Sequence, residues 1–197
     1  MKQKSNNDLD QERVKSTLDF QPEELEQRDD KGYTALTKAC SLPAVGIRVV
    51  SHLINTKMVD VNSQLPPELN TEDAAAKWLT PGMTALSVAI RRGNVKCIST
   101  FMNRKQMIDF ESKDHDGNTA LHHCLLSSNV SKDAFKKPPP CYQQLNIRGM
   151  RNGEDKSPLD IAVERWKQSD TKKEEKNRDV LEFVLNNMDP SGKWKNQ

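Results

Sequence analysis

Residues 82–86 read Gly-Met-Thr-Ala-Leu, and the same template returns at residues 32–36 and 117–121. A weaker copy, Asp-Lys-Ser-Pro-Leu, stands at residues 155–159. Glycine tolerates the positive φ of a tight turn, threonine or serine is a good helix N-cap, and alanine or proline suits the first helical position. Each copy therefore predicts a turn followed by a helix, and the repetition predicts a stack of similar helical units.

The residues that follow the template predict how these units pack. A leucine comes two residues after each capping position and a small residue comes five after it, which lets neighbouring helices approach closely. Gly93 then marks a break before a second, outer helix in the second copy. The leucines are Leu36, Leu86, Leu121 and Leu159, and the small residues are Ala39, Ala89, Cys124 and Ala162. The apolar pairs expected on outer helices are Val49, Val50, Leu53 and Ile54 in the first copy, Cys97, Ile98, Phe101 and Met102 in the second, and Val180, Leu181, Val184 and Leu185 in the fourth.

The pattern resembles the ankyrin repeat, in which a Thr-Pro-Leu-His-x-Ala helix start follows an Asp-x-x-Gly turn. The resemblance implies an all-α solenoid of about four helix-turn-helix repeats with helical caps. The third repeat is degenerate, because lysines and Pro138-Pro139-Pro140 stand where its outer helix needs apolar pairs. We expect a helical cap at residues 1–25, in which Gln21-Pro22 closes the helix, a repeat domain at 26–188 and a flexible tail at 189–197. Insertions are expected at 63–80, on the turn side of the stack, at 127–150 and at 167–177, a stretch that mixes Lys and Glu.

Composition narrows the function classes. The 197 residues include 30 basic and 28 acidic ones, a formal net charge of +2, which argues against nucleic-acid binding. No run of 18 apolar residues occurs, so we expect no membrane insertion. The four cysteines lie far apart, which argues against a disulfide framework or a zinc clip and favours a cytoplasmic setting, or a host cytosol if the protein is a delivered effector.

His122-His123-Cys124 is the cluster that most suggests metal binding or catalysis. Adjacent helical residues point about 100° apart, so three neighbours cannot all face one ion. Under the resemblance, His122 ties the turn to the helix and Cys124 fills a small core position. We therefore expect no catalytic residue, metal ligand or cofactor, and the chain is not expected to be an enzyme.

The resemblance implies binding of another protein through the turn tips and the exposed side of the inner helices, on the concave face. Such a module acts as an adaptor or a host-directed effector, and we expect a monomer. One alternative is a regulatory or targeting fragment of a larger protein; another is a metal-dependent enzyme that uses His122 and Cys124. Aromatic and arginine side chains dominate binding hot spots. For Trp78, a second role is weighed equally with partner binding: packing the insertion onto the stack. The expected partner-binding residues are Tyr33, Lys38, Trp78, Met83, Arg91, Arg92, Asn118 and His123.

Overall fold

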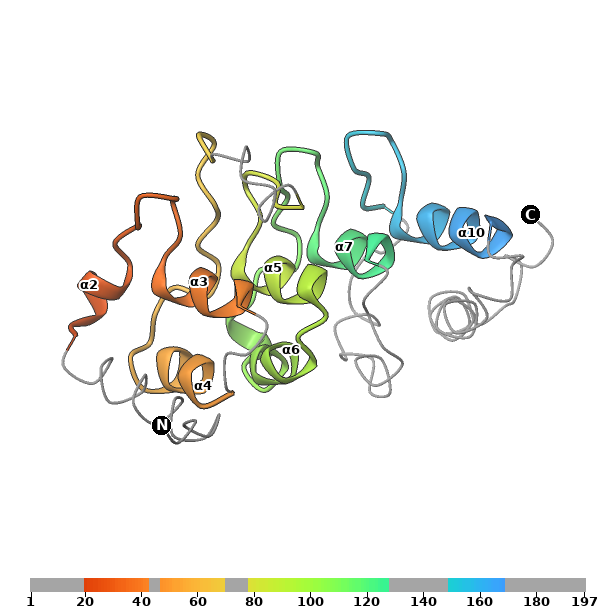
Figure 1. The fold of residues 1–197 in the computed structure, drawn as a ribbon. Helices are drawn as coiled ribbons and strands as arrows, with labels where there is room; N and C mark the ends of the chain where they lie inside the picture. The colour runs from red at the N-terminus through yellow and green to blue at the C-terminus, as the bar shows by residue number, and fades with distance from the viewer. Residues whose placement is uncertain (1–19, 43–46, 70–77, 128–148, 169–197) are drawn as a thin grey trace, which may run out of the picture.

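The computed structural model describes residues 20–42, 47–69, 78–127 and 149–168 (Figure 1). Across these ranges the chain is helical, and its single β-type pairing is an isolated antiparallel bridge between Gln64 and Thr84. The prediction of an all-α chain is therefore confirmed for this part of the sequence. No helix in these ranges has the length and apolar character needed to cross a membrane.

The helices form two layers, with long hairpin-like turns projecting from one side (Figure 1). Helices α3, α5, α7 and α10 lie in one row, the inner layer, in which each contacts the next. Helices α4 and α6 lie beneath this row and contact each other. The inner helices are α3 (Ala35–Ser41), α5 (Ala85–Arg92), α7 (Ala120–Leu126) and α10 (Pro158–Gln168). The other elements are α2 (Pro22–Leu25), α4 (Ile47–Asn55), α6 (Val95–Met102) and the short 3-10 helix η1 (Lys105–Met107).

The template residues start the inner helices as their chemistry predicts. Thr34 Oγ1 accepts a hydrogen bond from the amide of Thr37, and Thr84 Oγ1 accepts one from Ser87, both at 3.3 Å. Gly82 has a φ of +82° and Gly93, which ends α5, has a φ of +67°. Both values lie in the left-handed region that favours glycine. Local sequence therefore sets where these helices begin and end.

The core lies between the two layers and between successive inner helices. Leu36, Leu86 and Leu121 are buried, as are Ala39, Ala89 and Ala162, so the predicted packing positions are confirmed there. Leu159 and Cys124 are only partly buried, although both pack against the core. The apolar pairs of α4 are buried, and those of α6 are buried except Met102, which lies partly exposed against the core.

Three expectations about the chain's edges need correction or lie outside the described ranges. Gln21-Pro22 does not close a helix but opens one: proline occupies the first turn of α2, where its missing N–H costs nothing. Helix α10 continues through residues 167 and 168, where the third insertion was expected to begin. The cap segment 1–19, residues 70–77, 128–148 and 169–177 of the insertions, the fourth outer helix and the tail 189–197 lie outside the described ranges.

Candidate functional site

The tips of the hairpins are held by one repeated hydrogen-bond pattern. Asp29 Oδ1 accepts from the amides of Lys31 and Tyr33 at 3.0 and 2.9 Å, two and four residues ahead. Asp114 and Asn152 repeat this arrangement in the third and fourth hairpins, with distances between 2.7 and 3.0 Å. Such side-chain bonds to the local backbone replace the hydrogen bonds that a turn otherwise lacks. The backbone of these tips is therefore held in one conformation, which fixes where their side chains start.

The second hairpin is built differently, and sequence reasoning missed how. Leu65 stands where Asp29 and Asp114 stand in their hairpins, because its N donates to Met83 O and its O accepts from Gly82 N. Leucine has no side-chain oxygen to accept the tip amides, and the neighbouring Gln64 bonds the hairpin instead. Its Nε2 lies 2.8 Å from the Gly82 carbonyl oxygen and 2.9 Å from that of Lys113. One amide side chain thus joins the second hairpin to the third. The early part of the 63–80 insertion consequently belongs to the stack.

Neighbouring hairpins also bond directly through their backbones. His115 N donates to the Pro81 carbonyl oxygen at 3.0 Å, and Gly153 N donates to Asp116 O at 2.7 Å. The approach is so close that a Cβ on Gly117, whose φ is +75°, would come within 2.6 Å of the Gly153 nitrogen. The second, third and fourth hairpins are therefore held in a row by main-chain contacts, while the Arg28 side chain joins the first hairpin to the Gln64 carbonyl oxygen.

Cationic and aromatic side chains gather where α3 and α5 face these hairpins. We call Tyr33, Lys38, Trp78, Arg91 and Arg92 the cationic cluster. The Lys38 Nζ lies 4.8 Å from the centre of the Tyr33 ring, and the Arg92 guanidinium carbon lies 4.6 Å from the centre of a Trp78 ring. Arg91 Nη2 donates to the Trp78 carbonyl oxygen at 3.4 Å. Five of the eight residues expected to bind a partner thus form two groups beside the neighbouring helices α3 and α5, Tyr33 with Lys38 and Trp78 with both arginines.

Electrostatics connect the two halves of this cluster. Burial raises the pKa of Tyr33, while the positive charges of Lys38, Lys31 and Arg92 partly oppose that increase. Helix α5, which carries Arg92, contacts α3, the helix that follows the Tyr33 hairpin. Lys38 is neutralised by Asp29, whose Oδ2 lies 3.1 Å away. Within the described ranges, no carboxylate lies within salt-bridge distance of Arg91 or Arg92.

Trp78 is partly buried and packs against the core while it contacts both arginines. The end of the 63–80 insertion therefore lies over α5, whereas we expected the insertion to project from the turn side. Packing, the alternative interpretation of Trp78, is thus confirmed. Its contact with a partner stays a prediction.

Four residues expected to be exposed are instead buried: Tyr33, Met83, Asn118 and His123, with at most 8% of their surface accessible. The Met83 sulfur faces inward and accepts from Thr80 N at 3.2 Å, and the Asn118 side-chain oxygen accepts from Asn152 Nδ2 at 3.0 Å. His123 is held by Asp114. The expectation that these side chains are exposed was therefore wrong, while their binding to a partner stays a prediction. Of the inner-helix positions just before the small residues, only Lys38 is substantially exposed, with 44% of its side chain accessible.

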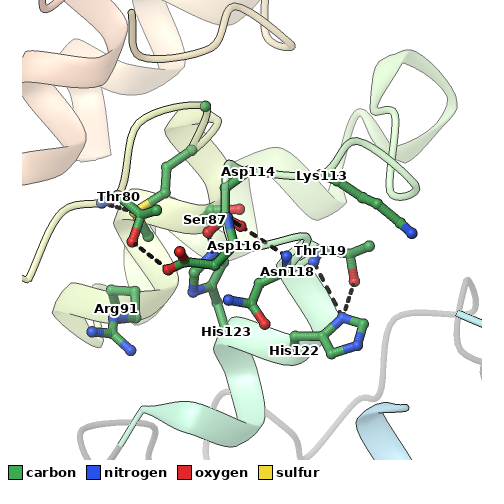
Figure 2. A network of polar contacts seen from close by, with 12 residues as sticks. Thr80, Ser87, Arg91, Lys113, Asp114, Asp116, Asn118, Thr119, His122 and His123 are labelled. Atoms are coloured by element: carbon green, nitrogen blue, oxygen red, sulfur yellow. Dashed lines mark hydrogen bonds and ion pairs between the residues drawn. The ribbon is translucent and has the colours of Figure 1, made fainter. Parts of the chain in front are cut away.

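The two adjacent histidines of α7 point in different directions (Figure 2). His122 is fully buried; its Nδ1 lies 3.2 Å from Thr119 N and 2.9 Å from Thr119 Oγ1, and its Nε2 lies 3.1 Å from the Lys156 carbonyl oxygen. Burial lowers the pKa of His122, which keeps the ring neutral. The expected role of His122, tying the turn to the helix, is confirmed, and the ring also reaches the next hairpin.

His123 forms a buried pair with Asp114. Its Nε2 lies 2.8 Å from Asp114 Oδ2, and the two side chains are 2% and 1% exposed. Its Nδ1 has no hydrogen-bond partner. The pair fixes the third hairpin onto α7 from inside the stack, out of reach of a macromolecular partner.

We expected no metal ligand, and the alternative hypothesis was a metal-dependent enzyme that uses His122 and Cys124. Both ring nitrogens of His122 already make hydrogen bonds, so coordination would break one of them. The described residues contain no group of three His, Cys, Asp or Glu side chains arranged to hold an ion. Cys40 and Cys97 are completely buried, and a hydrogen bond with Cys97 together with burial raises the pKa of the Cys40 thiol.

A cleft of about 690 Å³ opens between the third and fourth units. Its apolar part includes Leu126 and Ile161, and its polar walls include Asp116, Glu164 and Arg165. Leu126 is 39% exposed although it lies on an inner helix. The cleft and the cationic cluster are both built from hairpins and inner helices, so they are two parts of the same repeated surface.

Comparison of the chain with known protein families and with curated proteins found no match.

Proposed function

We propose that this chain is an ankyrin-type repeat module that binds another protein, and that it acts as an adaptor or an effector and not as an enzyme. The partner contacts the face formed by the inner helices and the hairpins, which we call the concave face. The observation that carries the proposal is the row of hairpins above the inner helices, in which backbone hydrogen bonds join the second, third and fourth and the Arg28 side chain joins the first (Figure 1).

Three features support this use of the surface. Repeat stacks bury their core between neighbouring units and leave an extended face, which suits macromolecular contacts. That face carries partly exposed side chains of several kinds, including Lys38, Arg91, Arg92 and Leu126. The internal hydrogen bonds of the tips hold the face in shape before a partner arrives, which reduces the entropy lost on binding.

Affinity capture with matched variants tests the proposal. A concave-face variant carries Lys38→Ala and Leu126→Asp, and an outer-face control carries Lys96→Ala and Ser99→Ala, both exposed on α6. We expect a protein that forms a stoichiometric complex with the wild type and the control but is lost from the concave-face variant, while all three proteins keep their helical circular dichroism. A partner that is lost from the outer-face variant alone would contradict the proposal. So would failure of the chain to form any stoichiometric complex.

A further inference from the structure

We infer that the cationic cluster binds an acidic linear segment of the partner protein, with carboxylates received by Arg91 and Arg92. The inference rests on the proposed function and adds the chemical class of the ligand. It begins from an unusual placement of charge. Two consecutive arginines at the end of α5 both contact Trp78, and among the described side chains neither has a carboxylate within salt-bridge distance.

The geometry leaves donors available on both guanidinium groups. An arginine stacked over an aromatic ring keeps its N–H edges free, because the ring contacts the flat face of the group. Arg92 is stacked in this way and is exposed, and Arg91 uses one Nη atom for the Trp78 carbonyl. Guanidinium groups form paired, parallel hydrogen bonds with carboxylates. The cluster therefore offers two oriented sites for acidic side chains.

Trp78 holds both arginines before a ligand binds. The ring limits the rotamers of Arg92 and the backbone oxygen limits those of Arg91, so less side-chain entropy is lost when a carboxylate arrives. Among the described residues no carboxylate neutralises these two like charges, so their repulsion raises the free energy of the unbound surface. An acidic ligand removes that repulsion. Lys38 differs, since Asp29 already neutralises it.

The overall charge favours an acidic protein segment over nucleic acid. The chain has a formal net charge of only +2 and 28 acidic residues. Nucleic-acid binding draws its affinity from many phosphate contacts spread over a basic face. Two arginines beside a partly exposed tryptophan match a short acidic segment instead.

Selection from a library of phage-displayed random peptides tests the inference on the full chain. We expect the wild type to enrich peptides rich in Asp and Glu. Their affinity should fall about tenfold or more for an Arg91→Ala, Arg92→Ala variant, as for arginine hot spots. The control variant Lys96→Ala, Lys105→Ala removes two exposed positive charges away from the cluster and should bind like the wild type. Because charge contributes, affinity should also weaken as salt is added.

An Arg91→Lys, Arg92→Lys variant separates geometry from charge. It keeps both charges but loses the planar fork, so we expect affinity between that of the wild type and that of the alanine variant. Circular dichroism and melting temperature confirm that each variant remains folded.

The possible failures are distinguishable. Enriched peptides that are not acidic, or whose affinity survives Arg91→Ala, Arg92→Ala, would overturn the inference and leave the proposed function standing. If a single-stranded RNA oligonucleotide bound the wild type more tightly than every selected peptide and lost binding in the alanine variant, the cluster would be a nucleic-acid site instead. Absence of any enriched peptide, together with no protein complex in affinity capture, would refute both.

Discussion

Replacing Leu86 by alanine tests the packing of the inner helices most directly. Leu86 is 2% exposed and lies on α5, which contacts α3, α6 and α7. The substitution removes three carbon atoms, and at about 0.8 kcal/mol for each buried methylene the lost transfer free energy is about 2.4 kcal/mol. Helices on three sides limit collapse of the cavity, so a further cavity cost applies, and measured losses for buried leucines span about 2–5 kcal/mol. We expect a loss of about 3–4 kcal/mol in the free energy of unfolding, toward the middle of that range.

Leu126→Ala is the matched control, since this leucine is on an inner helix but 39% exposed. Its truncation should cost about 1 kcal/mol or less, because much of the side chain is already in water. Both variants are compared with the wild type by equilibrium urea unfolding, followed by helical circular dichroism. Since a domain of this size is stable by only about 5–15 kcal/mol, the difference is readily measured. Equal midpoint shifts for the two variants would refute the assignment of Leu86 to the interface between units.

Three further predictions concern the hairpins, the buried histidine and metal. Gly117→Ala should destabilise by more than the roughly 1 kcal/mol cost of a left-handed alanine, because the new Cβ would lie 2.6 Å from the Gly153 backbone nitrogen; an unchanged melting temperature would contradict the close hairpin contact. Because burial lowers the pKa of His122 below its usual 6.5, the unfolded chain binds the proton more readily, and stability should fall as pH drops below that value. His122→Gln should flatten this slope between pH 7 and 5 in urea titrations, whereas His52→Gln should leave most of it in place, because His52 is only partly buried and His122 is fully buried. Treatment with a chelator should not change the melting temperature, and a stoichiometric metal lost together with folding would overturn the scaffold role of His122.

The candidate site could be predicted in part, because helix periodicity says which residues share a face but not what covers that face. Lys38, Arg91 and Arg92 remain accessible as expected, since nothing neutral or apolar can bury a long charged side chain cheaply. Met83 and His123 are buried because a hairpin packs over each of them. Helix periodicity does not predict such packing, because it depends on how the turn folds and on residues outside the helix. The signal that could have indicated the burial of His123 was Asp114, a carboxylate nine residues earlier in a tight turn.

What the sequence determined by itself is the set of local starts and stops. Thr34 and Thr84 cap helices, Gly82 and Gly93 adopt positive φ, and the leucine and alanine positions are buried, because each outcome depends on a few neighbouring residues. Only the tertiary structure decided that Gln64 would join two hairpins and that Trp78 would turn back onto the arginines of α5. Those contacts join segments up to 49 residues apart, where the path of the chain and the space between helices set the geometry. Helix caps and turns are encoded within a few residues, whereas a surface exists only after the units have stacked.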